Sequence, residues 1–332
     1  MLQFLRKIAF PFSLIYALIV HIRNYLFDWG VLKSISYKTP TVCVGNLSVG
    51  GTGKTPMIEY LIRTLSNHKI AVLSRGYKRK SKGFLLATPS STVAELGDEP
   101  FQIHQKFPKV SVAVDADRRN GIAQLEKMVQ PDVILLDDAF QHRKVKPKFS
   151  ILLTAYNQLY PKDWYLPTGN LRDAKREARR ANIIVVTKCP KDLPKKEKDA
   201  ITNRLRPTPN QQVLFSHLSY AEQLKDSKGN PVAPSELGGK KIALVTGIAS
   251  PEPLVRHLKD IGMDFQHLTF GDHHNFSSDE IEKFKHYDAV LTTEKDFVRL
   301  SGKVEPLFYM EVAHEFDFED GNLLKEVVES QL

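Results

Sequence analysis

The sequence predicts a doubly wound α/β domain with a mostly parallel sheet, followed by a second, smaller α/β domain. Short and fully apolar segments alternate with segments of helical periodicity, which is typical of a parallel sheet covered by helices on both faces. A proline-rich polar region near residues 190–240 separates two stretches of this pattern. The chain of 332 residues is also long for a single hydrophobic core, which favours two domains.

The chain begins with an apolar segment at residues 8–20 that has basic residues on both sides. This segment is shorter than the roughly 20 apolar residues that cross a bilayer, and no small-residue cleavage site of a signal peptide follows it. We therefore expect residues 1–28 to form a helix that lies in a membrane surface, with its cationic flanks near the lipid headgroups. A helix that packs against the domain is the alternative interpretation.

A P-loop domain is predicted for residues 29–215, where the buried strand at residues 41–44 runs into a glycine-rich turn. Met57, Ile58 and Leu61 continue as the apolar stripe of a helix, and Pro56 stands in its tolerant first turn. Glycines let backbone N–H groups approach phosphates, and the helix N-terminus adds partial positive charge. The predicted nucleotide-binding residues are Ser48, Val49, Gly50, Gly51, Thr52, Gly53, Lys54 and Thr55.

Within this turn, Lys54 is expected to reach the β- and γ-phosphates and the Thr55 hydroxyl to ligate Mg²⁺. The usual motif has a glycine six residues before the lysine, and Ser48 stands there instead. Gly50 and Gly51 supply the flexibility that this departure removes.

Further strands follow in order at residues 70–74, 110–114, 133–136, 151–154 and 183–187, and residues 213–215 form a candidate connecting strand. The smaller α/β domain is predicted for residues 216–332. Its expected strands are residues 242–245, 265–269 and 289–291, and its expected helices are residues 251–261 and 279–286.

Two acids, Asp137 and Asp138, end the apolar strand at residues 133–136. In a P-loop fold this position suits an acidic Mg²⁺ ligand beside Thr55, although one of two adjacent acids can simply cap a turn. Gln141 and His142 follow in the same predicted cleft, and His142 taken alone is compatible with a structural role.

Other polar residues follow strands at the same predicted edge of the sheet. Arg75 comes after the second strand and could reach phosphates, and Asp98 is a candidate base if it lies near the phosphate loop. His273 and His274 adjoin a strand of the second domain, but no third ligand has zinc spacing. Arg172, Arg176, Arg179 and Arg180 are spaced as one helical face, either for a phosphate or acidic lipid or as a solvated basic surface.

The charge and the late-strand sequence limit the possible ligands. A formal net charge of +9 favours anionic partners, but no nucleic-acid motif accompanies it. Cys43 and Cys189 adjoin predicted strands and suit a reducing compartment. Guanine recognition commonly needs an aspartate two residues after a lysine that follows a late strand. Here Pro190 stands two residues after Lys188, so ATP is favoured over GTP. A membrane-associated P-loop GTPase or switch protein remains the alternative function, and a basic nucleic-acid ATPase is a third.

Taken together, the motifs resemble the tetraacyldisaccharide 4′-kinase family of lipid A biosynthesis. The resemblance runs from the N-terminal apolar segment to about residue 300, and the shared order of the motifs makes it specific. The stretches that carry it are residues 44–56, 74–77 (Ser-Arg-Gly-Tyr), 97–100 (Gly-Asp-Glu-Pro), 136–142, 166–173, 272–274 (Asp-His-His) and 293–296 (Thr-Glu-Lys-Asp).

The resemblance implies transfer of the ATP γ-phosphate to the 4′-hydroxyl of a tetraacylated glucosamine disaccharide 1-phosphate, with Mg²⁺ as cofactor. It implies a peripheral or monotopic enzyme at the cytoplasmic face of a Gram-negative inner membrane. We expect it to be a monomer that binds the membrane surface and no nucleic acid.

The resemblance also assigns candidate roles to single residues. Lys54 and Thr55 serve the nucleotide and the metal, and Asp98 is the catalytic base with His273 as its partner. Asp137 and Asp138 are the acids on the metal side, while Gln141, His142 and Arg172 line the active site. The family commonly has Arg-Glu where this chain has Arg172-Asp173, which leaves the role of Asp173 open.

Overall fold

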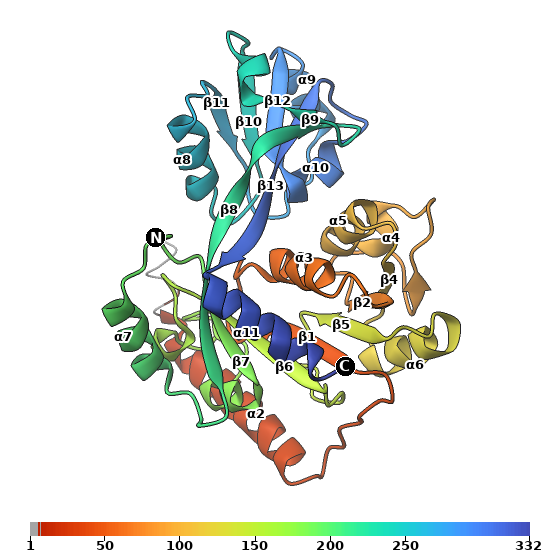
Figure 1. Cartoon of the computed structure of the whole chain (residues 1–332), viewed down its shortest axis with the longest axis vertical. Coiled ribbons are helices and arrows are strands. Elements are labelled where there is room, and N and C mark those ends of the chain that lie inside the picture. The colour runs from red at the N-terminus through yellow and green to blue at the C-terminus, as the bar shows by residue number, and fades with distance from the viewer. Residues whose placement is uncertain (1–5, 7) are drawn as a thin grey trace.

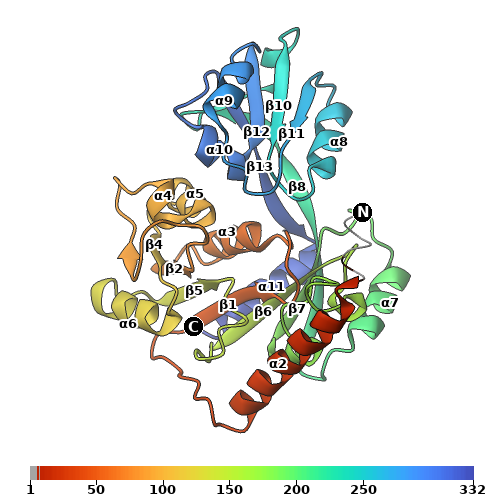
Figure 2. The same cartoon turned by 180° about the vertical axis from the view of Figure 1, so that it is seen from behind.

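A computed structural model of the protein describes residue 6 and residues 8–332. Two α/β units are stacked along the long axis and share one continuous 13-stranded sheet path (Figures 1 and 2). In the larger unit the strands are β1 (Thr41–Asn46), β2 (Ile70–Ser74), β3 (Leu85–Leu86), β4 (Ser111–Val114), β5 (Val133–Asp137), β6 (Phe149–Ala155) and β7 (Ile183–Thr187). Its helices are α2 (Phe10–Asp28), α3 (Lys54–Thr64), α4 (Val93–Leu96), α5 (Asp98–Lys106), α6 (Arg118–Met128), α7 (Lys195–Leu205) and the 3₁₀ helices η1 (Tyr160–Lys162) and η2 (Lys175–Arg180).

In the larger unit the strand order is β7-β6-β1-β5-β2-β4-β3, and all neighbours are parallel except β3 with β4. The predicted fold class is therefore confirmed. The chain leaves β1 toward β2 on one side and later adds β6 on the other, so β1 lies at the topological switch point. Ligands of such sheets bind beyond the carboxyl ends of the strands at that point.

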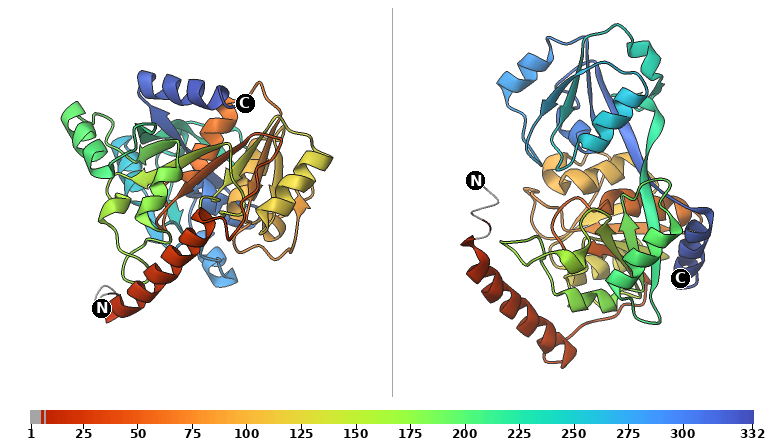
Figure 3. Two further views of the ribbon diagram at one scale, coloured as in Figure 1. Left: turned by 90° about the horizontal axis from the view of Figure 1, so that it is seen from below. Right: turned by 90° about the vertical axis from the view of Figure 1, so that its left-hand side faces the viewer.

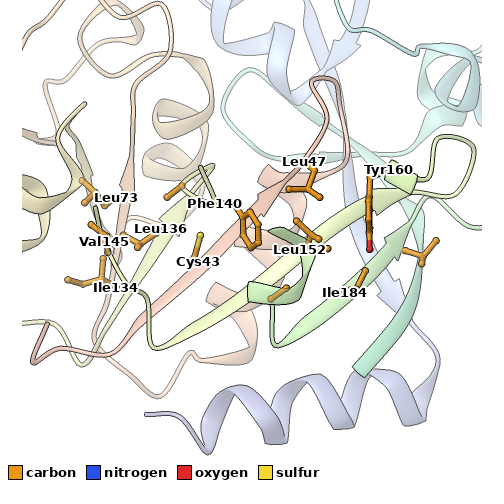
Figure 4. Packing of buried hydrophobic residues seen from close by; sticks show 14 of the residues in the cluster. Cys43, Leu47, Leu73, Ile134, Leu136, Phe140, Val145, Leu152, Tyr160 and Ile184 are labelled. Atoms are coloured by element: carbon orange, nitrogen blue, oxygen red, sulfur yellow. The ribbon is translucent and has the colours of Figure 1, made fainter. Parts of the chain in front are cut away.

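Side chains of β1 alternate between two hydrophobic clusters, one on each face of the sheet. Cys43 belongs to the first cluster, and Val42 and Val44 belong to the second. Figure 4 shows residues of the first cluster, among them Cys43, Leu47 and Phe140. Helix α3 covers the second cluster with Met57, Ile58, Leu61 and Ile62, which confirms the stripe expected from the sequence.

Gly45 is required for the close approach of Phe140 to β1. A Cβ at Gly45 would lie only 2.5 Å from the Phe140 Cβ. Phe140 is the second residue after Asp138, so this contact helps to hold the acidic turn against the first strand.

The smaller unit has the order β11-β10-β12-β13. Its strands are β10 (Ile242–Thr246), β11 (Gln266–Thr269), β12 (Ala289–Thr293) and β13 (Leu307–Phe316), with the short β9 (Pro231–Val232) on β8 (Gln212–Asp226). Its helices are α8 (Glu252–Asp260), α9 (Ser278–Phe284), α10 (Glu294–Leu300) and the 3₁₀ helix η3 (Pro234–Leu237). The expected elements agree with these to within a few residues, whereas α10, β13 and the final helix α11 (Phe318–Glu329) were not anticipated.

Strands β8 and β13 form an antiparallel ribbon that joins the two units (Figure 1). Strand β8 pairs first with β7 over Gln212–Phe215 and then with β13. The predicted connecting strand at residues 213–215 is thus the start of a much longer one. After β13 the chain returns to the larger unit, where Leu324 and Val328 of α11 join the second cluster. The boundary near residue 215 stays a prediction, and we propose that α11 belongs with the larger unit.

The helical face predicted for the four arginines at residues 172–180 is wrong. Only residues 175–180 are helical, as the 3₁₀ helix η2, and Arg172 lies before it. The reason is that the Arg172 N–H donates to the Leu47 carbonyl at 2.8 Å, which holds this backbone against the phosphate loop instead. Arg176 pairs with Asp28 at 2.9 Å, and Arg180 pairs with Glu177 at 2.7 Å, so neither is an unpaired basic surface group.

Helix α2 runs along the outside of the larger unit (Figure 3). One face is docked: Val20 and Phe27 are buried, and the buried Asn24 side chain donates to Asp173 at 2.7 Å. Asp173 is itself completely buried, and the hydrogen bond that it accepts from Asn24 holds α2 to the larger unit. The opposite face exposes a row of large apolar side chains, namely Phe12, Leu14, Ile15, Leu18, Ile19 and Ile22.

The basic residues beside this helix do not extend toward solvent as the interfacial interpretation expected. Arg6 donates to the carbonyls of Pro167 and Gly169, Arg23 donates to the Gln141 carbonyl, and His21 contacts the Tyr165 hydroxyl at 2.9 Å. The Arg6 contacts arise where the N-terminal end of α2 approaches the loop at residues 166–170, whereas Arg23 and His21 reach the neighbouring segments at Gln141 and Tyr165. Lys7, another flanking residue, lies outside the described residues.

Candidate active site

The phosphate-loop residues 48–53 follow β1 directly, and α3 begins at Lys54. Gly50 and Gly53 have φ angles of 118° and 85°, a left-handed region that glycine adopts without strain. Ser48, which stands in place of the usual glycine, donates its hydroxyl to Asp163 at 2.9 Å. The Val49 N–H donates to the Asn170 carbonyl at 2.7 Å. The loop is therefore anchored to the segment around residues 163–172 on one side.

The two acids at the end of β5 have different electrostatic environments. Arg172 donates to both oxygens of Asp138, and the Lys54 ammonium lies 3.9 Å from Asp138 Oδ1. Burial raises the pKa of Asp138, but Lys54 and Arg172 outweigh it, so the net shift is downward. Burial and the adjacent Asp138 raise the pKa of Asp137 to about 6, even though Ser74 donates to it at 2.9 Å.

The other residues expected around the acidic pair, Gln141, His142 and Arg75, have different surroundings. The Gln141 amide donates to the Asn46 carbonyl at 2.7 Å, which places it against the end of β1. His142 lies 3.9 Å from Asp117 and is largely desolvated, and burial lowers its pKa to about 4. The His142 Nε2 atom has no hydrogen-bond partner among the described residues. Arg75 is exposed.

Asp98 and His273 come together across the two units. His273 Nδ1 lies 3.0 Å from Asp98 Oδ2. On the far side of the ring, Lys295 donates to His273 Nε2 at 2.9 Å. An ammonium group only donates hydrogen bonds, so Nε2 accepts from Lys295, while Nδ1 faces both the Asp98 carboxylate and Arg299 Nη2, which lies 2.9 Å away.

Arg299 of α10 is the second partner of Asp98. Its Nε donates to Asp98 Oδ1 at 2.9 Å, and its Nη2 donates to Oδ2. Burial raises the pKa of Asp98, but the hydrogen bonds from His273 and Arg299 outweigh it and lower the pKa to about 2. Asp98 is consequently an ionised carboxylate in a fixed orientation at neutral pH.

Sequence reasoning missed Arg299 and the contact role of Lys295. Both lie on α10 four residues apart, a spacing that places them on one face of a helix. Lys295 belongs to the Thr293–Asp296 stretch that contributed to the resemblance, so the helical spacing from it was the available signal for Arg299. Asn46, whose amide donates to the Thr52 hydroxyl at 2.8 Å, lies within the stretch at residues 44–56, whereas Asp163, which accepts from Ser48, lies outside every stretch that carries the resemblance.

The site residues converge at one edge of the sheet because β1, β2 and β5 are parallel neighbours. Their carboxyl ends carry the phosphate loop, the loop around Arg75 and Tyr77, and the acidic pair. The Tyr77 ring packs on His273 with centroids 5.5 Å apart. Glu99, next to Asp98, is near enough to Asp137 to raise the pKa of that carboxyl further. The arrangement therefore brings a phosphate cradle, two acids and a carboxylate–histidine pair to one place.

Comparison with known proteins shows the family of the chain. The sequence model of the tetraacyldisaccharide-1-P 4′-kinase family matches residues 5–332. The chain belongs to the tetraacyldisaccharide 4′-kinase family. A tetraacyldisaccharide 4′-kinase of Flavobacterium johnsoniae is 51% identical over 95% of this chain and 94% of its own length. The protein of the same name from Bacteroides thetaiotaomicron is 46% identical over 92% of this chain and 87% of its own.

A solved structure agrees with this family membership. The "apo" form of the Aquifex aeolicus enzyme, crystallised in complex with ATP, superposes with a TM-score of 0.80 at 31% identity, covering 98% of this chain and 99% of that one. The predicted function is thus confirmed at the level of the tetraacyldisaccharide 4′-kinase family: the protein is a phosphotransferase of lipid A biosynthesis. The family membership favours the kinase over the GTPase and nucleic-acid interpretations.

Proposed function

We propose that the chain transfers the γ-phosphate of ATP to the 4′-hydroxyl of a tetraacylated glucosamine disaccharide 1-phosphate, with the roles assigned below. The observation that supports this most directly is the Asp98–His273 pair, 3.0 Å apart, at the same sheet edge as the phosphate loop. A cradle for a triphosphate and a fixed carboxylate for an alcohol are the two parts that phosphoryl transfer requires.

In this proposal the loop N–H groups and Lys54 hold the β- and γ-phosphates. Lys54 now contacts Asp138 at 3.9 Å, a distance at which its ammonium is only loosely held and free to turn to a phosphate oxygen. Arg172, which grips Asp138 with two donors, keeps that carboxylate in place when Lys54 leaves.

The donor set beside the loop suits Mg²⁺. No cluster of three His, Cys, Asp or Glu side chains that would hold a metal alone occurs in the part of the chain that the structure describes. Mg²⁺ normally takes only one or two carboxylates and completes its shell with phosphate oxygens and water. We assign it to Thr55, Asp137 and Asp138, where the raised pKa of Asp137 marks a negative charge without full compensation. When bound, the ion would neutralise charge on the transferring phosphate.

Asp98 is proposed to accept the hydroxyl proton of the sugar. Its low pKa makes Asp98 a weak base, so we expect it to contribute more by orienting the sugar hydroxyl than by its proton affinity. This suits phosphoryl transfer, in which positioning and electrostatic stabilisation dominate catalysis. His273 orients the carboxylate through its Nδ1 atom, and Arg299 restrains both carboxylate oxygens.

The activity test is incubation of the purified chain with ATP, Mg²⁺ and the acylated disaccharide 1-phosphate, followed by mass spectrometry of the lipid. We expect one added phosphate with ATP and little with GTP. A substrate that lacks the 4′-hydroxyl is the matched control. Phosphate on that control lipid would contradict the assigned acceptor position, and equal use of GTP would contradict the nucleotide assignment.

We also propose that α2 binds the cytoplasmic surface of the inner membrane, where its lipid substrate resides. Within the described residues, α2 is the one helix that is long and apolar enough to cross a membrane by length and composition. The side of α2 that faces away from the larger unit is apolar and exposed to solvent: Phe12 is 67% exposed and Leu18 is 60% exposed. A helix docked on one face and apolar on the other is suited to lying in an interface rather than spanning it.

Replacing Ile15, Leu18 and Ile19 together with glutamate should abolish vesicle binding and leave folding intact, because all three side chains are exposed. Flotation with vesicles that contain anionic phospholipid measures the bound fraction. Phe318→Glu is the control, since Phe318 is 84% exposed but lies on α11. Unchanged flotation of the triple variant would rule out this surface as the membrane contact.

A further inference from the structure

Strand β13 carries a buried histidine into contact with the phosphate loop. His314 Nε2 lies 2.9 Å from the Gly53 carbonyl, and His314 Nδ1 lies 3.0 Å from the Ser216 hydroxyl. The side chain is 4% exposed. His314 and Ser216 belong to β13 and β8, the two strands of the ribbon that joins the units.

The partners of His314 fix its tautomer. A carbonyl oxygen only accepts hydrogen bonds, so Nε2 must carry the proton and donate it to Gly53. Nδ1 is then the acceptor, and the Ser216 hydroxyl donates to it. Burial lowers the pKa of His314 to about 4, so the ring is neutral and this arrangement persists at physiological pH.

The bond acts on the peptide group that contributes the Lys54 N–H. A trans peptide is planar and its C=O and N–H point in opposite directions. With the Gly53 carbonyl directed to His314, the Lys54 N–H must point away from the ribbon. The same carbonyl also accepts the Met57 N–H at 3.1 Å, so His314 occupies the second lone pair.

The preceding peptide is held in the same manner. The Thr187 hydroxyl donates to the Thr52 carbonyl at 2.9 Å, so two successive loop carbonyls are bound by side chains from other strands. The contact also leaves no room for a side chain, since a Cβ on Gly53 would lie 2.7 Å from His314 Nε2. Loop N–H groups bind phosphate only when their carbonyls face elsewhere.

We propose that His314 is a positioning residue for the nucleotide phosphates, which fixes the Gly53–Lys54 peptide and ties it to the interdomain ribbon. The inference rests on the proposed role of the phosphate loop. It adds a residue from beyond the loop's own domain, so a shift of the ribbon at Ser216 and His314 would reach the phosphate site directly.

The test compares His314→Gln with His314→Asn. The Gln amide nitrogen can reach the position of Nε2 and keep the donor to Gly53, whereas the Asn amide is too short. We expect His314→Asn to raise the KM for ATP and the calorimetric Kd by about tenfold, the effect of one lost buried hydrogen bond. The kcat at saturating ATP should stay within about twofold, and His314→Gln should restore most of the affinity.

Ser216→Ala is the companion variant. It removes the hydrogen bond to His314 Nδ1 without changing the loop, and the substitution is small, so we expect the variant to fold. It should raise the ATP Kd in the same direction by a smaller factor. A wild-type ATP Kd in both His314→Asn and Ser216→Ala, even with a lowered melting temperature, would overturn the proposal. Lys54→Ala separates failure of the His314 proposal from failure of the proposed phosphate loop. If Lys54→Ala also leaves ATP binding unchanged, the role proposed for the loop itself is wrong.

Discussion

Replacing Asp98 with asparagine is expected to lower kcat by about 10²–10⁴-fold while the Kd for ATP changes little. The substitution keeps the side-chain shape but removes the charge that accepts the proton of the sugar hydroxyl. It also places an amide NH₂ where one carboxylate oxygen accepted hydrogen bonds, so the contacts with His273 and Arg299 are weakened. Steady-state kinetics with the lipid substrate and calorimetry with ATP measure the two quantities separately.

Glu99→Gln is the matched control for Asp98→Asn. Glu99 is the next residue and also carries a carboxylate near His273, at 3.8 Å from Nε2, but it makes no contact with Arg299 in the described part of the chain. We expect a small effect on kcat. Lys54→Ala should instead weaken ATP binding as well as turnover. Equal losses of ATP affinity in Asp98→Asn and Lys54→Ala would remove Asp98 from the base role.

The stability of Asp98→Asn must be measured alongside its activity. The pKa of Asp98 is lowered in the folded protein, so its ionised form stabilises the fold above the ordinary carboxyl pKa. That contribution is lost as pH falls toward about 2. At neutral pH it is fully present in the wild type and absent in the variant, so we expect a lower melting temperature for Asp98→Asn with ATP affinity retained.

Local sequence patterns were sufficient for the strands of the larger unit and for α3, and the same patterns predict the nucleotide part of the site. Strand β1, the glycines of the loop and the stripe of α3 are contiguous, so propensity and periodicity identify them together. Asp137 and Asp138 were identified for the same reason, since the end of an apolar strand marks the sheet edge. The pairing of Asp98 with His273 is different, because 175 residues separate them and only the family resemblance suggested it.

What the sequence did not indicate depends on contacts between distant segments. Arg172 has helical spacing to Arg176, yet its backbone is held by Leu47. Strand β13 alternates between apolar and polar residues without a clear period because it passes from one unit to the other, so no strand pattern marks it. The return of α11 to the larger unit depends on where β13 ends, which the sequence does not indicate. The roles of Arg299 and Lys106 depend on carboxylates from distant parts of the chain, and no local pattern specifies those partners.

Lys106 is the centre of a second contact between the two units. Its ammonium lies 2.7 Å from Glu59 of α3, 2.5 Å from Glu294 of α10 and 3.0 Å from Glu311 of β13. Glu59 and Glu294 are buried, so the lysine offsets carboxylates that water does not reach. Burial, and next Glu59, raise the pKa of Glu294 to about 7, which indicates that this negative charge is only partly compensated.

Lys106→Met is therefore expected to cost about 3–5 kcal/mol of stability at pH 8, the effect of removing one partner from a buried ion cluster. The methionine preserves most of the apolar stem, so the loss reports the charge. Urea denaturation followed by circular dichroism measures it, and Lys285→Met is the control, because the Lys285–Glu282 pair is exposed and should contribute little to stability.

The pH dependence of this loss provides the sharper test. Glu294 has a raised pKa in the folded state, so its protonated form favours the fold, and that stabilisation is lost as pH rises through about 7. Without Lys106 the pKa of Glu294 should rise further, and the penalty of Lys106→Met should shrink between pH 8 and pH 6. Adding Glu294→Gln to the variant should recover part of the stability at pH 8. A penalty that is the same at both pH values and in the double variant would mean that packing, rather than charge, accounts for the role of Lys106.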